Sequence, residues 1–82
     1  MNWPIWWDWE LEISPHVEKR MEERNFTEID LRDMMQRAQA CDPDEIEGRY
    51  VIQTRLQQHN WKIIVEPDEI DHFLVVITAF PI

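Results

Sequence analysis

The stretch "SPHVEKRMEERNFTEIDLRDMM" (residues 14–35) decides the fold, because it carries the start and stop signals of two consecutive helices. Ser14 is a preferred N-cap residue, and Pro15 fits the first helical position. Asn25 tolerates the left-handed conformation that commonly follows the end of a helix. This pattern predicts a short helix over about residues 15–24 that ends at Asn25.

The second helix is announced by a capping pattern. Thr27 can cap the helix, and Asp30 three residues later completes a variant of the capping box. Phe26 and Leu31 stand at the two positions of a hydrophobic staple. A core-facing stripe then follows the helical period: Leu31, Met34, Met35 and Ala38. We therefore expect this helix to bury one face against a sheet.

The segments around the helices read as strands, because they alternate apolar and polar residues or are apolar throughout. Four such segments occur: 7–14 before the helices, and 49–56, 61–66 and 72–80 after them. The last is the longest apolar run and indicates a central strand covered on both faces for most of its length. The acidic stretch 41–48 is expected to be a loop. We predict one α+β domain over residues 1–82, of order β-α-α-β-β-β, with two helices packed on one face of an antiparallel, meandering sheet.

Parity determines which side chains share a face of this sheet. A tight hairpin at 57–60 would place Leu56 opposite Trp61, and by the same pairing Arg55 opposite Lys62. A shift by one residue would expose the apolar face of one strand. The face away from the core then carries polar side chains: Arg49, Gln53, Arg55, Lys62 and, with an even register in the second hairpin, Thr78. The three cations of this face, Arg49, Arg55 and Lys62, either bind an anion or form salt bridges to Glu66 or the acidic loop.

Composition limits the function classes. The formal net charge is −9, and residues 1–48 carry 5 basic and 13 acidic side chains. This balance counts against a nonspecific nucleic-acid binder, whose affinity comes mostly from neutralising phosphates, but it leaves room for a small basic cleft. The single cysteine, Cys41, excludes an internal disulfide, and it has no nearby basic residue to activate it. With no secretory signal and no apolar run of about 18 to 20 residues, we expect a cytoplasmic protein that does not enter a membrane.

A row of cations marks the first helix. His16, Arg20 and Arg24 recur every four residues, so they lie along one side of that helix. Glutamates on the same helix supply partners at i,i+4 spacing, so the row is either a solvated face or an anion site. His16 stands in the first turn, where the helix dipole disfavours a proton on the imidazole. A neutral imidazole beside arginines suits a general base next to a phosphate.

Other chemistry finds little support in the residues. The three histidines, at positions 16, 59 and 72, lack the Cys, His and carboxylate spacing of a metal site, so we expect neither a metal nor another cofactor. A single glycine argues against a nucleotide-cradling loop. The tryptophan-rich N-terminus, "MNWPIWWDWELEI", either packs as a strand across the sheet or leaves an exposed patch for a partner.

Four segments resemble a known family. They are "HVEKRMEERNFTEIDL" (16–31), "GRYVIQTR" (48–55), "WKIIVEPD" (61–68) and "LVVITAFP" (74–81). In these segments, and in the leading "WWDWELE", the chain is similar to an uncharacterised family of small bacterial proteins usually grouped with the RelE/ParE and BrnT-like toxin folds. The resemblance implies a RelE-like fold whose open sheet face bears the active site in ribonuclease members. By matched position it implies polar residues on the helix, His16 and Arg20, and on the sheet, Arg49, Arg55 and Thr78.

Three functions follow as expectations. The first is a toxin-like, metal-independent endoribonuclease or a degenerate relative, with RNA as substrate and an antitoxin-like protein as partner. Its candidate residues are catalytic His16, Arg20, Arg49, Arg55 and Thr78, and anion-binding Arg24 and Lys62. The second is a noncatalytic protein-interaction module that uses the tryptophan-rich N-terminal strand and the acidic helices. The third is an acidic domain that binds a basic partner or mimics nucleic acid. An exposed strand edge also permits a homodimer.

Overall fold

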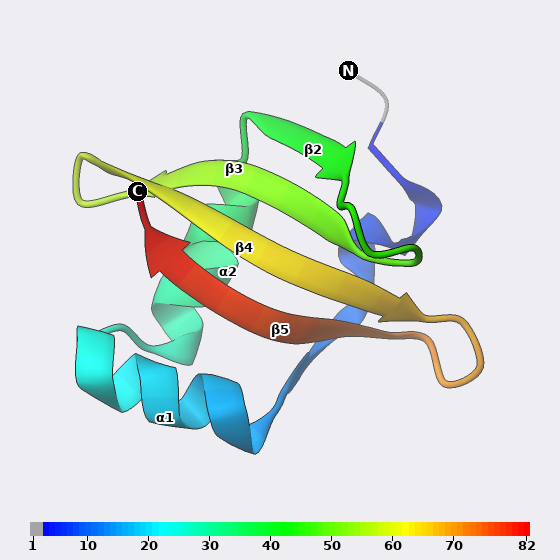
Figure 1. Ribbon diagram of the computed structural model, residues 1–82, viewed down its shortest axis with the longest axis horizontal. Helices are drawn as coiled ribbons and strands as arrows, with labels where there is room; N and C mark the ends of the chain where they lie inside the picture. Colours follow the sequence, from blue (N-terminus) through cyan, green and yellow to red (C-terminus); the bar gives the residue numbers. More distant parts are fainter. Residues whose placement is uncertain (1–2) are drawn as a thin grey trace.

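The computed structural model describes residues 3–82 as a five-stranded sheet with two α-helices (Figure 1). The elements, in chain order, are a 3₁₀ turn η1 (Ile5–Asp8), β1 (Glu10–Ile13), α1 (Pro15–Arg24), α2 (Glu28–Gln36), β2 (Ala40–Pro43), β3 (Tyr50–Leu56), β4 (His59–Asp68) and β5 (Phe73–Pro81). The sheet order is β1-β5-β4-β3-β2. The predicted α+β class, with both helices on one side of the sheet, is confirmed. Among residues 3–82 no helix is long and apolar enough to cross a membrane.

Both helices begin where the local signals predict, and α1 also ends at the predicted Asn25, whereas α2 ends at Gln36, so Ala38 of the predicted stripe lies beyond it. The Ser14 side chain accepts a hydrogen bond from the Val17 backbone N–H, and Asn25 follows α1 with a φ of 55°. At α2 the Thr27 hydroxyl accepts from the Asp30 N–H, while the Asp30 carboxylate accepts from the Thr27 N–H at 2.8 Å. Each cap satisfies backbone donors that a helix leaves without an internal partner.

The N-terminal strand is shorter than predicted. The alternating pattern predicts extended chain over residues 7–14, but β1 begins only at Glu10. The preceding residues form η1, in which the Trp7 N–H donates to the Pro4 carbonyl. This turn carries Trp6 into the core, where it is 5% exposed. The tryptophan segment therefore packs mainly as a turn and not as a strand.

The sheet differs from a simple antiparallel meander in two ways. First, β1 pairs with β5 in parallel, so the sheet is mixed. Second, the stretch predicted as an acidic loop begins with a strand, because β2 pairs antiparallel to β3. The chain leaving α2 runs beside the otherwise open edge of β3 and occupies its free backbone groups, starting with the Gln39 N–H on the Gln53 carbonyl. The half-buried Cys41 therefore lies in a strand.

The predicted register of the first hairpin is wrong by two residues. Leu56 lies opposite His59 and Arg55 opposite Asn60, because the turn consists of Gln57 and Gln58 alone, both with positive φ. A shift of two leaves every side chain on its predicted face. The residues of the predicted core face, such as Ile52 of β3 and Ile63 of β4, therefore still point at the helices.

An irregularity in β5 determines which of its side chains reach the open face. Val65 pairs with Val76 while Ile64 pairs with Thr78, so Ile77 is an extra residue in β5. The bulge allows Val76 and Ala79, an odd number of residues apart, both to be buried. It also turns Thr78 to the face away from the helices, where Lys62 and Ile64 lie.

The core lies between the sheet and the two helices. Its fully buried apolar side chains come from α1, from the stripe of α2 and from β3, β4 and β5: Val17, Leu31, Met34, Ile52, Ile63, Val65, Leu74, Val76 and Ala79. One polar side chain joins them, because the buried Thr54 hydroxyl donates to the Met34 carbonyl near the end of α2 at 2.5 Å. That carbonyl is in the last turn of the helix and also accepts the Arg37 N–H at 3.2 Å, so Thr54 supplies it with a second donor. The prediction that the last strand, β5, is covered on both faces is only partly confirmed. Its helix side is buried, whereas Val75, Thr78 and Phe80 on the other side are half-buried.

Candidate functional site

Three of the predicted site residues gather on the open face of the sheet, the face turned away from the helices. Lys62 of β4 lies opposite Gln53 of β3 and Phe80 of β5. Arg55 and Thr78 are its diagonal neighbours on the flanking strands, at Cα separations of about 7–8 Å. The Arg55 guanidinium donates to the Gln58 carbonyl of the hairpin turn at 3.1 Å. This cluster, Arg55, Lys62 and Thr78, is the part of the predicted site that the fold assembles on the sheet.

Arg49 does not belong to this cluster. It precedes β3 by one residue and lies six residues before Arg55, which in extended chain is about 20 Å. Its Nε donates to Oε1 of Glu66 at 3.3 Å. The salt bridge to Glu66, one of the two interpretations left open by the sequence, is therefore present. Arg49 and Arg55 are too far apart to hold one phosphate together.

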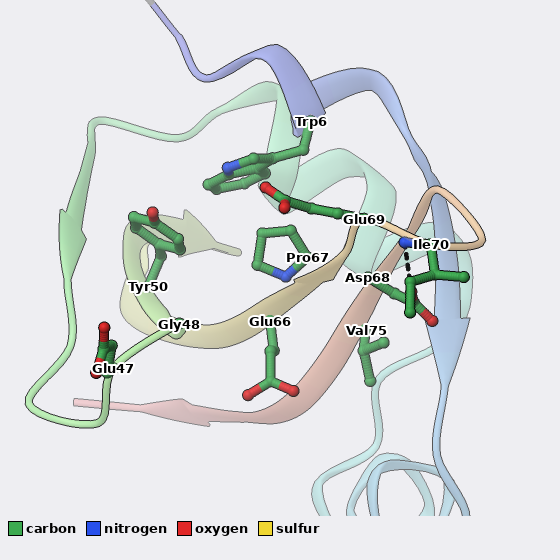
Figure 2. A pocket seen from close by; sticks show the side chains of 10 residues that line it. All are labelled: Trp6, Glu47, Gly48, Tyr50, Glu66, Pro67, Asp68, Glu69, Ile70 and Val75. Carbon is green, nitrogen blue, oxygen red and sulfur yellow. Dashed lines mark hydrogen bonds between the residues drawn. The ribbon is translucent and has the colours of Figure 1, made fainter.

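A hollow of about 600 Å³ that the sequence did not reveal lies at the end of the sheet near the β4–β5 turn. Its apolar wall consists of Trp6, Tyr50 and Pro67, with the Trp6 and Tyr50 ring centroids 4.9 Å apart. Carboxylates surround that wall: Glu47, Glu66, Asp68 and Glu69. Figure 2 shows the two rings on one side of β4 and the Glu66 carboxylate on the other, so the hollow wraps around the end of the strand. We call it the aromatic cleft.

The carboxylates of the aromatic cleft differ in the groups that they bind. Asp68 shapes the turn, since its Oδ1 accepts hydrogen bonds from the backbone N–H groups of Ile70 and Asp71. Glu66 binds Arg49. Glu69 extends over the aromatic side in Figure 2, and Ile70 at the rim is 91% exposed. The sequence signal that could have found this site is the acidic turn "EPDEID" (66–71), although nothing local shows that Trp6 and Tyr50 pack beside it.

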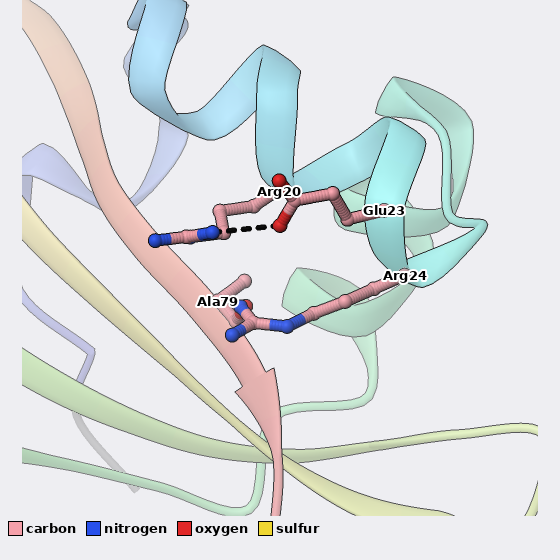
Figure 3. Close-up of polar contacts among 4 residues, drawn as sticks. All are labelled: Arg20, Glu23, Arg24 and Ala79. Atoms are coloured by element: carbon pink, nitrogen blue, oxygen red, sulfur yellow. Dashed lines mark hydrogen bonds and ion pairs between the residues drawn. The ribbon is translucent and has the colours of Figure 1, made fainter.

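Two of the three predicted cations of α1, Arg20 and Arg24, form hydrogen bonds within the fold. Arg20 donates to Oε2 of Glu23 at 2.6 Å, and this hydrogen bond lowers the pKa of the Glu23 carboxyl. Arg24 donates through Nη1 to the backbone carbonyl of Ala79 in β5 at 2.8 Å. Figure 3 shows both guanidinium groups extending from α1 toward β5. His16, at the other end of the row, is exposed.

The bond from Arg24 closes part of a strand edge. β1 pairs only with Phe73–Val76, and within residues 3–82 no other strand continues along that edge of β5. The outward carbonyl of Ala79 would otherwise be left to solvent or to another chain. In Figure 1 α1 lies beside this edge of β5, whereas α2 crosses behind the sheet. Arg24 therefore has a structural role, whatever else it binds.

The predicted site residues thus fall into three groups. Arg55, Lys62 and Thr78 share the open face; His16, Arg20 and Arg24 line α1 beside β5; Arg49 lies at the far end of the sheet with Glu66. Among residues 3–82 no three His, Cys, Asp or Glu side chains are grouped as metal ligands. Burial raises the pKa of the Cys41 thiol, which leaves less of the nucleophilic thiolate.

Comparison with known proteins adds a family. The model of a domain of unknown function, DUF4258, matches residues 13–81. The chain belongs to the DUF4258 family. The DUF4258 match takes in all of the predicted site residues and leaves out the tryptophan-rich segment with Trp6. No curated protein and no solved structure matches the chain.

Proposed function

We propose that this DUF4258 domain is a noncatalytic protein-interaction module, built on a scaffold related to the RelE/ParE and BrnT-like toxins, that binds a basic segment of a partner protein in the cytoplasm. The kinship to the toxins is supported by the four resembling segments and by the order of the helices and strands. The cytoplasm suits a chain whose one cysteine has no partner for a disulfide.

The noncatalytic part of the proposal is supported by the hydrogen bonds of the four arginines predicted as catalytic or anion-binding. Arg20 and Arg49 each bind a carboxylate, and Arg24 and Arg55 each bind a backbone carbonyl. These contacts lie within the fold and explain the cations without a substrate. A phosphoryl-transfer site instead needs its cations directed at one position where charge develops.

The observation that carries the binding part is the aromatic cleft. A volume of about 600 Å³ lies in the range of ligand sites. Guanidinium and ammonium groups bind the faces of tryptophan and tyrosine and pair with carboxylates. Trp6 is only 5% exposed and mainly supports Tyr50, so the half-buried Tyr50 ring is the more accessible part of the aromatic wall. Tyr50 and the carboxylates around it therefore suit an arginine or lysine side chain of a partner, and the net charge of −9 favours encounter with a basic segment.

The experiment compares two peptides that differ in charge alone. A fluorescently labelled arginine-containing peptide is titrated with the protein by anisotropy, beside a peptide in which citrulline replaces each arginine. We expect binding of the arginine peptide and a loss of affinity of about two- to fivefold in Glu69→Gln. The matched control is Glu22→Gln on α1, which removes the same charge from an exposed site outside the cleft. Equal binding of both peptides, or equal effects of the two variants, would refute the cleft as the site.

A second candidate, the RNA-cleaving function, is favoured by one specific observation. Arg24, Thr78, Lys62 and Arg55 form a band that runs from the edge of β5 across β4 to β3. With strands about 4.8 Å apart, the band spans about 10 Å of sheet. Phe80, opposite Lys62, adds an aromatic ring of the kind on which bases stack. His16, the predicted general base, lies eight residues and about 12 Å from Arg24 along α1, so the band itself would bind the RNA and the assay decides whether His16 takes part in cleavage.

This candidate has a separate test. Cleavage of a labelled single-stranded RNA is measured in EDTA with the wild-type chain, His16→Ala and Lys62→Ala, and with Lys19→Ala as an exposed control on α1. Metal-independent cleavage that both site variants lose and the control retains would support a ribonuclease. Wild-type protein that leaves the RNA intact would exclude it and keep the interaction module.

A further inference from the structure

The open face of the sheet has a charge pattern that is complementary to itself. Along β4 its side chains are Lys62, Ile64 and Glu66, at every second residue and all half-buried. Val51 and Thr78 flank Ile64 on the neighbouring strands. Both helices and the core lie on the other side, so within residues 3–82 no element covers this face.

The two ends of the face carry opposite charge. The end at the β3–β4 hairpin holds the two cations Arg55 and Lys62. The other end holds mostly carboxylates, contributed by β1 and β4: Glu10, Glu12, Glu66 and Asp68, beside Arg49. The pairing of Glu10 with Phe73 and of Glu12 with Val75 places both β1 glutamates on this face. The middle of the face, around Ile64, is largely apolar.

We propose that this face binds the same face of a second copy of the chain, about a two-fold axis that passes by Ile64 and runs across the strands. Such an axis reverses β4 against the partner's β4. Lys62 and Glu66 are each two residues from Ile64, so Lys62 of each copy meets Glu66 of the other. The basic end of each copy then lies over the acidic end of its partner, and the two Ile64 side chains pack near the axis.

The salt bridge already present is compatible with this arrangement. Glu66 is bound by Arg49 through Oε1, which leaves its second carboxylate oxygen for an incoming lysine. The Glu66 side chain is 46% exposed, so it is accessible to a partner. Arg49 repels the Lys62 of the second copy, but the acidic end of the face carries more carboxylates than cations, so its net charge still attracts that lysine.

The available area is sufficient for a specific dimer. Five strands spaced by about 4.8 Å, with a mean length of about seven residues at roughly 3.3 Å per residue, cover about 550 Å² per copy. Two copies would bury about 1,100 Å², just above the roughly 1,000 Å² expected of a biological interface. Two sheets packed in this way form a sandwich with strands about 30° apart, the usual angle for twisted sheets. The estimate predicts a reversible dimer and not an obligate one.

The test uses charge-reversal variants, because two variants that each weaken the dimer should restore its salt bridges when they are mixed. Molar mass is measured by sedimentation equilibrium over a range of concentrations for the wild type, Lys62→Glu and Glu66→Lys. We expect the wild type to dimerise and each variant alone to have its dissociation constant raised at least about tenfold, since like charges then meet twice. An equimolar mixture of the two variants should recover the dimer, because the carboxylate introduced by Lys62→Glu in one copy meets the ammonium introduced by Glu66→Lys in the other.

The control variant is Glu22→Lys, which makes the same charge change as Glu66→Lys on exposed α1 and should leave the dimer unchanged. Circular dichroism checks that each variant folds. A wild-type chain that stays at 10.1 kDa up to about 0.5 mM would overturn the proposal, as would a mixture no more associated than its components. Binding of a single-stranded oligonucleotide to a monomer, lost in Lys62→Glu, would assign the face to nucleic acid instead.

Discussion

Arg24 is predicted from the sequence to bind an anion, and replacing it separates that role from a structural one. Arg24→Gln removes the hydrogen bond from the guanidinium to the Ala79 carbonyl, which joins residues 55 positions apart. Hydrogen bonds to charged groups contribute about 1.5–3 kcal/mol when buried. Because this one is only partly buried, we expect a loss of about 1 kcal/mol in the free energy of unfolding. In a domain of this size that loss lowers Tm by about 4–8 °C.

The measurement is urea denaturation followed by circular dichroism, with thermal melts alongside. Arg20→Gln is the matched control, since it removes the same charge from the same helix but loses only an exposed contact with Glu23. We expect a much smaller shift in that variant. If Arg24→Gln and Arg20→Gln have equal Tm values, the bond to Ala79 contributes nothing to stability. The row on α1 would then be free to serve only as a binding surface.

Three further predictions concern stability and reactivity. Thr54→Val removes one of two hydrogen bonds to the Met34 carbonyl, since the Arg37 N–H also donates to it, and should cost about 1 kcal/mol by urea denaturation, against less than about 0.5 for the half-buried Thr78→Val; equal losses would contradict a contribution from the buried hydroxyl. Burial raises the pKa of the Cys41 thiol, so labelling by a disulfide reagent at about pH 8 should be slower than for a cysteine peptide and accelerate as pH rises; peptide-like rates would show an open thiol. The hydrogen bond from Arg20 lowers the pKa of Glu23, so the stability this pair provides is complete above the ordinary carboxyl pKa and disappears as pH falls through the lowered one. The stability difference between wild type and Glu23→Gln should therefore shrink as the pH falls below the ordinary carboxyl pKa, and a constant difference would count against the pair.

The sequence predicted the candidate site only where it was enough to know which face of a strand a residue occupies. Alternation placed Arg55 and Lys62 on one face, and a register error of two residues did not change that face. Thr78 reached the same face because of the extra residue Ile77 in β5, which no local pattern announces. The aromatic cleft was missed because Trp6 and Tyr50 come from segments far apart in the chain.

The sequence by itself determined the elements whose hydrogen bonds are local. Ser14, Thr27 and Asp30 cap helices through partners within three residues, and Asn25 ends a helix by its own backbone conformation. The period of the apolar residues likewise determined which side of each element is buried.

Only the tertiary structure decided which distant backbone groups meet. It paired β1 in parallel with β5, recruited β2 to the edge of β3, and directed Arg24 to the carbonyl of Ala79. A backbone N–H or carbonyl has the same chemistry in every residue that carries it. Its partner across the sheet is therefore determined by which edges remain open once the core has formed.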